Sequence, residues 1–186
     1  MGMRVRSAAS ALAAILIVGG AGAAYSAHSP TLSADGPTSV SGTTATAVFT
    51  IGTKTIRQVR YADREMLRYT FDIANNGLVP MTVIGLAPLA QPPTLLDYRS
   101  LTDREGLDEF TIAPRSGRAV TLSMLMTACE RLSARAGSLA TEVRVRTTSL
   151  GAFDGTVTID LPEQVQVGSP REASCPRATA SSRPPG

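Results

Sequence analysis

Apolar and polar residues alternate in several stretches of this chain. The clearest stretches are residues 67–74, 120–126, 143–146 and 157–161. A period of two places the apolar side chains on one face of a β-strand and the polar side chains on the other. The Val, Ile, Thr and aromatic residues in these stretches also favour strands. We therefore predict strands that each bury one face against a core.

Turn-forming residues separate these stretches. Asn75-Asn76-Gly77 follows the first stretch, and similar groups occur at residues 114–117 and 153–155. Asn and Gly tolerate the positive φ angles that tight connections need. Asn75 and Asn76 could instead belong to a polar ligand site, but a turn accounts for both residues, and we predict a turn.

About seven such strands, without a convincing long helix, predict an all-β fold. Their spacing is typical of an antiparallel immunoglobulin-like β-sandwich. We predict a strand over residues 119–126 and allow a helical turn over 130–134. A helical spacing also occurs in this region, at Leu122, Met126, Cys129 and Leu132. Met124 and Met126 are interpreted as core residues rather than as a metal-binding pair.

The N-terminus combines the basic segment MGMRVR with a span from Ser7 to Ala34 that has no charged residue. This span predicts an N-terminal apolar helix that could cross a membrane. Ala21-Gly22-Ala23 offers an A-x-A cleavage pattern, so residues 1–27 are either a membrane anchor or a signal peptide. We therefore predict a single-pass protein of the cell membrane with its C-terminal domain extracytoplasmic, or a protein secreted after cleavage.

Composition divides the rest of the chain into three parts. Residues 28–44 are rich in Ser, Thr, Gly and Pro, which predicts a flexible stalk. Residues 45–175 form the predicted β-sandwich domain. Residues 176–186 have too few apolar side chains to join a core, and we predict a disordered tail.

The two cysteines, Cys129 and Cys175, suit an exported protein. An even count in an oxidising compartment favours a single disulfide, which would stabilise the fold by restricting the unfolded chain. The alternative is a redox pair or a pair of metal ligands. No C-x-x-C motif occurs and the chain has one histidine, so the disulfide is the better interpretation.

Several segments occur in a recognisable order: IRQVRYADREMLRYTFDIANNGLVPMTVIGL, PRSGRAVTLSM, the ACE around Cys129, and Cys175-Pro176. Over roughly residues 50–176 they resemble a family of actinobacterial single-pass membrane or secreted proteins of uncharacterised activity. In that family a short apolar anchor precedes an exported immunoglobulin-like β-sandwich. The resemblance implies topology and fold, and no activity. The apolar segment is shorter and richer in Ala and Gly here, which leaves cleavage open.

The residues needed for common catalytic sites are scarce. Nucleophilic catalysis needs a base beside the nucleophile, and the single histidine, His28, lies in the predicted stalk. No G-x-S-x-G, H-E-x-x-H or phosphate-binding glycine loop occurs. We predict no catalytic residue and no cofactor.

The most acidic stretch is LTDREGLDEF, which contains Asp103, Glu105, Asp108 and Glu109. An oxygen-rich loop of this kind suits Ca²⁺, and two carboxylates could serve a glycosidase. Arg104 interrupts the cluster, however, and the glycine position does not match an EF-hand loop. We interpret the stretch as a solvated loop, with calcium binding as a weak alternative.

Basic residues recur through the segment before the first alternating stretch, at Arg57, Arg60, Arg64 and Arg68. We predict that they face solvent; the alternative is docking to an anionic polymer or to phospholipid headgroups. Without Arg4 and Arg6, 16 basic residues remain against 15 acidic ones. Stacking aromatics do not interleave with the arginines, so we expect no nucleic-acid partner.

These patterns favour a non-enzymatic extracytoplasmic binding or structural module tethered to the cytoplasmic membrane. Its expected partner is an unknown cell-envelope protein or polymer, because a fold alone does not name a ligand. The alternatives are an exported carboxylate-based hydrolase and a calcium- or small-ligand-dependent sensor domain.

Overall fold

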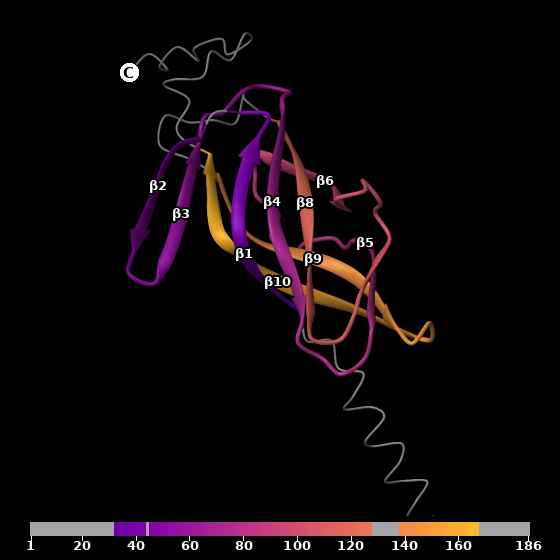
Figure 1. Ribbon diagram of the computed structural model, residues 1–186. Coiled ribbons are helices and arrows are strands. Elements are labelled where there is room, and N and C mark those ends of the chain that lie inside the picture. Colours follow the sequence, from indigo (N-terminus) through magenta and orange to yellow (C-terminus); the bar gives the residue numbers. More distant parts are fainter. Residues whose placement is uncertain (1–31, 44, 128–137, 168–186) are drawn as a thin grey trace, which may run out of the picture.

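The structure is a computed structural model that describes residues 32–43, 45–127 and 138–167, and this part of the chain is all-β (Figure 1). Its ten strands are β1 (Leu32–Ser41), β2 (Ala45–Ile51), β3 (Lys54–Val59), β4 (Met66–Asn75), β5 (Met81–Leu86), β6 (Leu96–Asp103), β7 (Phe110–Ile112), β8 (Ser116–Met126), β9 (Ser138–Ser149) and β10 (Phe153–Val167). The all-β prediction is confirmed, with ten strands in the described residues where about seven were expected.

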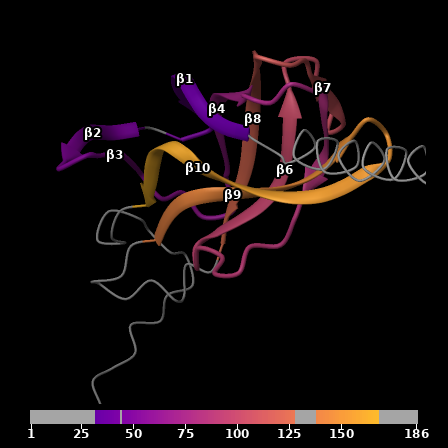
Figure 2. The same ribbon diagram turned by 90° about the horizontal axis from the view of Figure 1, so that it is seen from below.

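The strands form two sheets. A four-stranded sheet has the order β1-β4-β8-β6, and all of its pairs are antiparallel. A six-stranded sheet has the order β2-β3-β10-β9-β5-β7, in which β3 and β10 are parallel and the other pairs antiparallel. The long β9–β10 pair runs across behind β4 and β8 (Figures 1 and 2).

The core lies between the sheets and includes the apolar residues of the alternating stretches, together with residues that the alternation did not select. On β4 the buried positions are Leu67, Tyr69, Phe71 and Ile73. β8, β9 and β10 supply a matching set: Val120, Leu122, Met124, Met126, Val143, Val145, Ile159, Leu161, Val165 and Val167. Each fully buried large aliphatic or aromatic side chain contributes roughly 1.5–3 kcal/mol to folding. Met124 and Met126 are fully buried, which confirms their place in the core.

The predicted turn after β4 is confirmed, and it gives Asn75 a structural role. The Asn75 side chain is almost fully buried. Its Nδ2 donates to the backbone oxygens of Val79 (2.8 Å) and Ile112 (3.1 Å), and its Oδ1 accepts the N–H of Gly77 (2.9 Å). Because Asn75 is on β4 and Ile112 on β7, this side chain links the two sheets. Asn76 is exposed and bonds only Ser33 Oγ among the described residues (2.9 Å).

Strand β1 occupies residues that composition assigned to a stalk. It pairs with β4 from Leu32 opposite Asn75 to Ser41 opposite Arg68, with a register shift between Asp35 and Ser39. The stalk prediction is therefore wrong for these residues. Backbone hydrogen bonds between strands do not require apolar residues at every second position. The strand could therefore not be recognised from its Ser- and Gly-rich composition.

The last predicted turn lies three residues too late. Phe153 already belongs to β10, and the connection is Leu150-Gly151-Ala152, with a hydrogen bond from Ala152 N–H to Ser149 O (3.2 Å). Leu150 and Gly151, the two central residues of this turn, have positive φ angles of 51° and 67°, as a type I′ turn requires. Leu rarely adopts this conformation, which is why the position was not recognised.

Three further predictions fall outside the described residues: the N-terminal apolar helix of segment 1–27, the helical turn at 130–134 and the tail at 176–186. Among the residues that the structure does describe, no helix is long and apolar enough to span a bilayer.

Candidate functional site

The acidic loop between β6 and β7 is organised by Asp103, whose side chain is fully buried at the end of β6. Its Oδ1 accepts the N–H groups of Glu105 (3.0 Å) and Leu107 (2.9 Å). The backbone of Asp103 also bonds Leu107 and Gly106. Gly106 has a φ of 83°, which favours glycine at this tight point of the loop.

Arg118 on β8 completes the cluster. Its Nη2 donates to Asp103 Oδ2 (2.6 Å) and Glu105 Oε2 (2.9 Å), and its Nη1 donates to the backbone oxygen of Thr111 (3.3 Å). The guanidinium also lies 5.8 Å from the centroid of the Phe110 ring. The strand register brings the side chains of Asp103 and Arg118 together, because Asp103 on β6 pairs with Val120 on β8, two residues from Arg118.

The electrostatics of this cluster keep its buried carboxylate ionised. Burial alone would raise the pKa of Asp103, but the hydrogen bond from Leu107 N–H and the charge of Arg118 outweigh it. The pKa of Asp103 therefore lies below its ordinary value. The pKa of Arg118 is raised, first by its hydrogen bond to Glu105 and then by Asp103.

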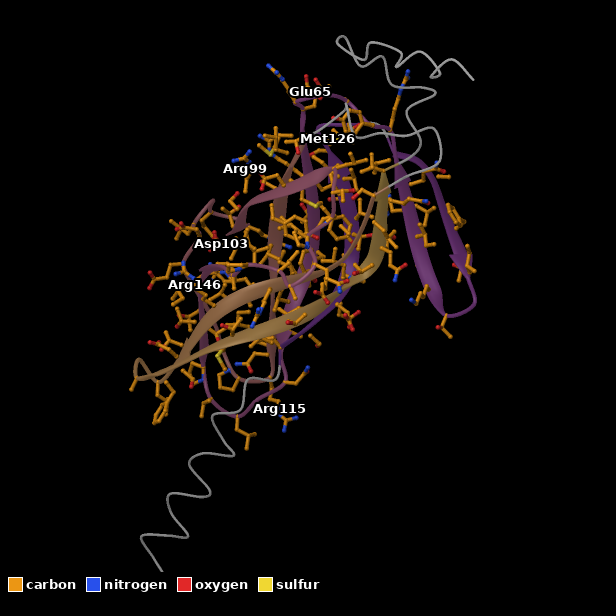
Figure 3. The ribbon with its side chains drawn as sticks, turned by 180° about the vertical axis from the view of Figure 1, so that it is seen from behind. Glu65, Arg99, Asp103, Arg115, Met126 and Arg146 are labelled. Carbon is orange, nitrogen blue, oxygen red and sulfur yellow. The ribbon has the colours of Figure 1, made fainter. Side chains whose placement is uncertain are left out.

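Beside this cluster lies an open cleft of about 450 Å³, lined by Asp72, Arg104, Glu105, Gly117, Arg118 and Ala119. Gly117 and Ala119 occupy outward positions of β8, where their small size leaves room. Asp72 stands beside them on β4, opposite Ala119 in the register. Arg104 and Glu105 come from the acidic loop. Figure 3 shows Asp103, next to the cleft, on the same flank of the domain as Arg99.

Two charged groups in the cleft have no partner among the described residues. Neither the carboxylate of Asp72 nor the guanidinium of Arg104 makes a hydrogen bond or ion pair within 32–43, 45–127 and 138–167. In contrast, the Arg118 guanidinium is occupied by Asp103, Glu105 and Thr111. The cleft can therefore offer one negative and one positive group to a ligand.

The structure divides the four acidic residues predicted from sequence. Asp103 and Glu105 meet at Arg118, whereas Asp108 and Glu109 are exposed and do not line the cleft. In the part of the chain that the structure covers, no three His, Cys, Asp or Glu side chains lie close enough to hold a metal ion. Asp72 and Arg118 were not predicted, because only strand pairing brings them near this loop.

The arginine series is not uniformly solvent-facing. Arg60, Arg64 and Arg68 are exposed, but Arg57 is mostly buried. Its Nε donates to Glu163 Oε2 at 2.5 Å, and its Nη2 donates to Glu163 Oε1 at 3.0 Å. The prediction was wrong for Arg57 because β3 pairs it with Val165, which turns its side chain toward the interior.

This ion pair joins both sheets. Arg57 Nη2 also donates to Thr38 Oγ1 on β1 (3.1 Å), and Glu163 N–H donates to the Tyr69 hydroxyl on β4 (3.2 Å). Burial, followed by the nearby Glu163 charge, raises the pKa of Tyr69. The network is structural, since its groups satisfy one another between the layers.

His28, Cys129 and Cys175 lie outside the described residues, so the predicted disulfide stays a prediction.

Comparison with known proteins adds little. No protein-family model and no curated protein match this chain. A solved structure described as the X-ray structure of Northeast Structural Genomics Consortium target SoR45 is similar with 10% sequence identity and a TM-score of 0.37. The match covers 75% of this chain and 88% of that chain. A similarity at this level supports no inference about fold or function.

Proposed function

We propose that the protein is a non-enzymatic binding module of the cell envelope. Its N-terminal apolar segment holds it at the outer face of the cytoplasmic membrane, or is cleaved to release it. Support comes from the basic MGMRVR followed by a span without charge, and from a cysteine pair suited to an oxidising compartment. We further propose that the two sheets form an immunoglobulin-like sandwich of the actinobacterial family that the sequence resembles.

One observation supports binding at a particular place: Asp72 and Arg104 are uncommitted charges in the cleft over Gly117 and Ala119. A guanidinium binds a carboxylate through two parallel N–H···O bonds, and a carboxylate accepts hydrogen bonds from ammonium or hydroxyl groups. The ligand class is therefore a small polar group with a carboxylate and a nearby amine or hydroxyl. Such groups occur at the ends of peptides and on envelope polymers.

The hydrolase alternative is less well supported. A carboxylate hydrolase needs one carboxyl group whose pKa is raised so that it can donate a proton. Asp103 has a lowered pKa, and it shares Arg118 with Glu105. Two carboxylates bound to one guanidinium are arranged for charge balance rather than for acid catalysis.

The calcium alternative faces a similar obstacle. Both oxygens of Asp103 already accept hydrogen bonds, from two backbone N–H groups and from Arg118. A cation would have to displace a guanidinium from this carboxylate. Thermal unfolding with and without Ca²⁺ distinguishes the two views, because a ligand that binds the folded form raises the melting temperature.

Calorimetric titration of the full chain with dialanine tests the proposal. N-acetyl-dialanine and dialanine amide serve as probes that lack one charge each. We expect Arg104→Gln to weaken binding of dialanine roughly tenfold to hundredfold, since a hydrogen bond to a charged group contributes about 1.5–3 kcal/mol. Asp72→Asn should weaken it in the same direction.

Arg99→Gln is the matched control, because Arg99 lies on β6 of the same sheet and pairs with Asp97 at 2.7 Å, away from the cleft lining. It should leave affinity unchanged. Equal losses in the Arg99 and Arg104 variants, or no binding of any of the three probes, would contradict the proposed ligand class.

A further inference from the structure

Gly117 on β8 is a glycine that the fold itself does not require. Its φ lies outside the left-handed region that favours glycine. Among the described atoms, a Cβ built at this position would contact only the backbone oxygen of Ile73, at the ordinary van der Waals distance of 3.8 Å. The residue lies past the Pro114-Arg115 turn and pairs with Ala74 in the β4–β8 ladder. The backbone and its surroundings would therefore accept alanine.

Gly36 on β1, in the same sheet, shows the contrast. Its φ is 83°, and a Cβ atom there would come within 2.5 Å of Asp72 Oδ2. The fold needs glycine at that position. A glycine in a strand without such a need destabilises the fold relative to alanine. At Gly117, neither backbone strain nor a steric contact among the described residues accounts for this destabilisation.

The position of Gly117 in the cleft accounts for it. Gly117 and Ala119 are outward positions of β8, and both line the cleft. A glycine in a strand often marks a place where a ligand or another backbone approaches closely. A side chain at position 117 would enter the cleft, whose walls include Asp72 and Arg104.

The edge of β8 is also open at this place. β4 pairs with β8 from Leu125 to Ser116, whereas β6 pairs with it from Met126 only as far as Val120. Residues 116–119 therefore have a paired strand on one side, β4, which lies beside β8 in Figure 1. An extended peptide can add to such an edge through backbone hydrogen bonds. Of the described residues that line the cleft, none is aromatic, so the cleft offers no ring on which a sugar or a base could stack.

We propose, resting on the binding function proposed above, that the ligand of the cleft is a short peptide whose main chain lies across Gly117. The opposite charges of the cleft select this occupant, because a peptide with free ends has an ammonium group for Asp72 and a carboxylate for Arg104. Backbone groups of residues 116–119 bond the peptide group between those ends. Gly117 then determines specificity, since a side chain in its place keeps the peptide group away from β8.

Two ligands of equal charge test the need for a peptide group, by calorimetric titration of the full chain. Glycylglycine and 5-aminopentanoate each carry an ammonium and a carboxylate separated by the same number of atoms, and only glycylglycine has a peptide group. We expect 5-aminopentanoate to bind roughly tenfold more weakly, because it cannot replace the hydrogen bonds of the peptide group. Equal affinities would overturn this inference and leave the proposed recognition of two charges intact. Binding of neither compound would also overturn it.

Substitution of Gly117 tests the close approach, with dialanine as the ligand. Gly117→Ala should raise the melting temperature by about 2–4 °C, as expected for replacing a strand glycine, and should weaken binding of dialanine. Gly117→Val has a bulkier side chain and should weaken binding roughly tenfold or more. Gly155→Ala is the matched control: Gly155 lies on β10 of the other sheet, its φ is not left-handed, and its Cβ atom would lie 3.5 Å from Thr147 Oγ1. This change should leave the affinity unaltered.

Three results of these substitutions would overturn the inference. A lower melting temperature of Gly117→Ala would show that the fold requires this glycine. Unchanged affinity of both Gly117 variants would show that the ligand does not approach position 117, and would leave binding at Asp72 and Arg104 standing. An equal loss of affinity in Gly155→Ala would assign the effect to the fold as a whole.

Discussion

Replacing Asn75 by alanine should destabilise the fold more than its position beside a turn suggests. The Asn75 side chain makes three hydrogen bonds: to the oxygens of Val79 and Ile112, and from the N–H of Gly77. Each intramolecular hydrogen bond contributes about 1 kcal/mol net, and leaving buried partners unsatisfied adds to the cost. We expect the free energy of unfolding of Asn75→Ala to fall by about 3 kcal/mol.

Urea unfolding followed by circular dichroism measures this change, with the dependence on urea concentration expected to match that of the wild type. Asn76→Ala is the matched control, because Asn76 is exposed and its side chain bonds Ser33 Oγ at 2.9 Å. That change should alter stability by no more than about 0.5 kcal/mol. Equal effects of the two substitutions would refute the role of Asn75 as a link between the sheets.

Three further predictions concern stability. Arg57→Met alone should cost about 2 kcal/mol because it leaves Glu163 mostly buried and unpaired, whereas adding Glu163→Gln should restore part of the loss in a double-mutant cycle by urea unfolding. Leu150→Asn should stabilise the protein by about 1 kcal/mol in thermal unfolding, since Leu150 has a φ of 51° and Asn-Gly suits this turn. The pKa of Asp103 is lower in the folded protein than in the unfolded chain, so its carboxylate stabilises the fold. This stabilisation is complete above the unfolded pKa of about 3.9 and is lost as the pH falls through the folded pKa. Asp103→Asn should therefore reduce the fall of the urea midpoint at acidic pH.

Much of the fold could be predicted because its central strands are half-buried. Leu67 to Ile73 and Val120 to Met126 alternate in the sequence and occupy the core in the structure. β1 could not be found in this way, since Leu32 is its one buried residue and the strand is held by backbone pairing with β4. The local pattern of apolar residues indicates which side chains are buried, and an edge strand such as β1 has few buried side chains.

The candidate cleft could be predicted only in part. The acidic loop was recognisable from LTDREGLDEF, but the grouping of Asp103 with Arg118 depends on the β6–β8 register. Asp72 reaches the same place through the β4–β8 register. When residues come together through the pairing of strands that are far apart in the sequence, no local sequence pattern identifies them. Neither Asp72 nor Arg118 was therefore predicted as a site residue.

Arg57 illustrates the same limit for charge. Four arginines at close intervals suggested one solvated surface, yet the parallel pairing of β3 with β10 directs Arg57 to Glu163 in the interior. Because the partner is more than a hundred residues away, the sequence offered no indication of an ion pair. A charge in a short strand can face either layer, and register decides which.

Nuclear magnetic resonance titration of the isotope-labelled full chain with dialanine tests the proposed binding site most directly. The largest amide shifts are expected at Asp72, at 104–105 and at 117–119, which line the cleft. Shifts confined to β2, or spread evenly over both sheets without saturation, would contradict binding in the cleft.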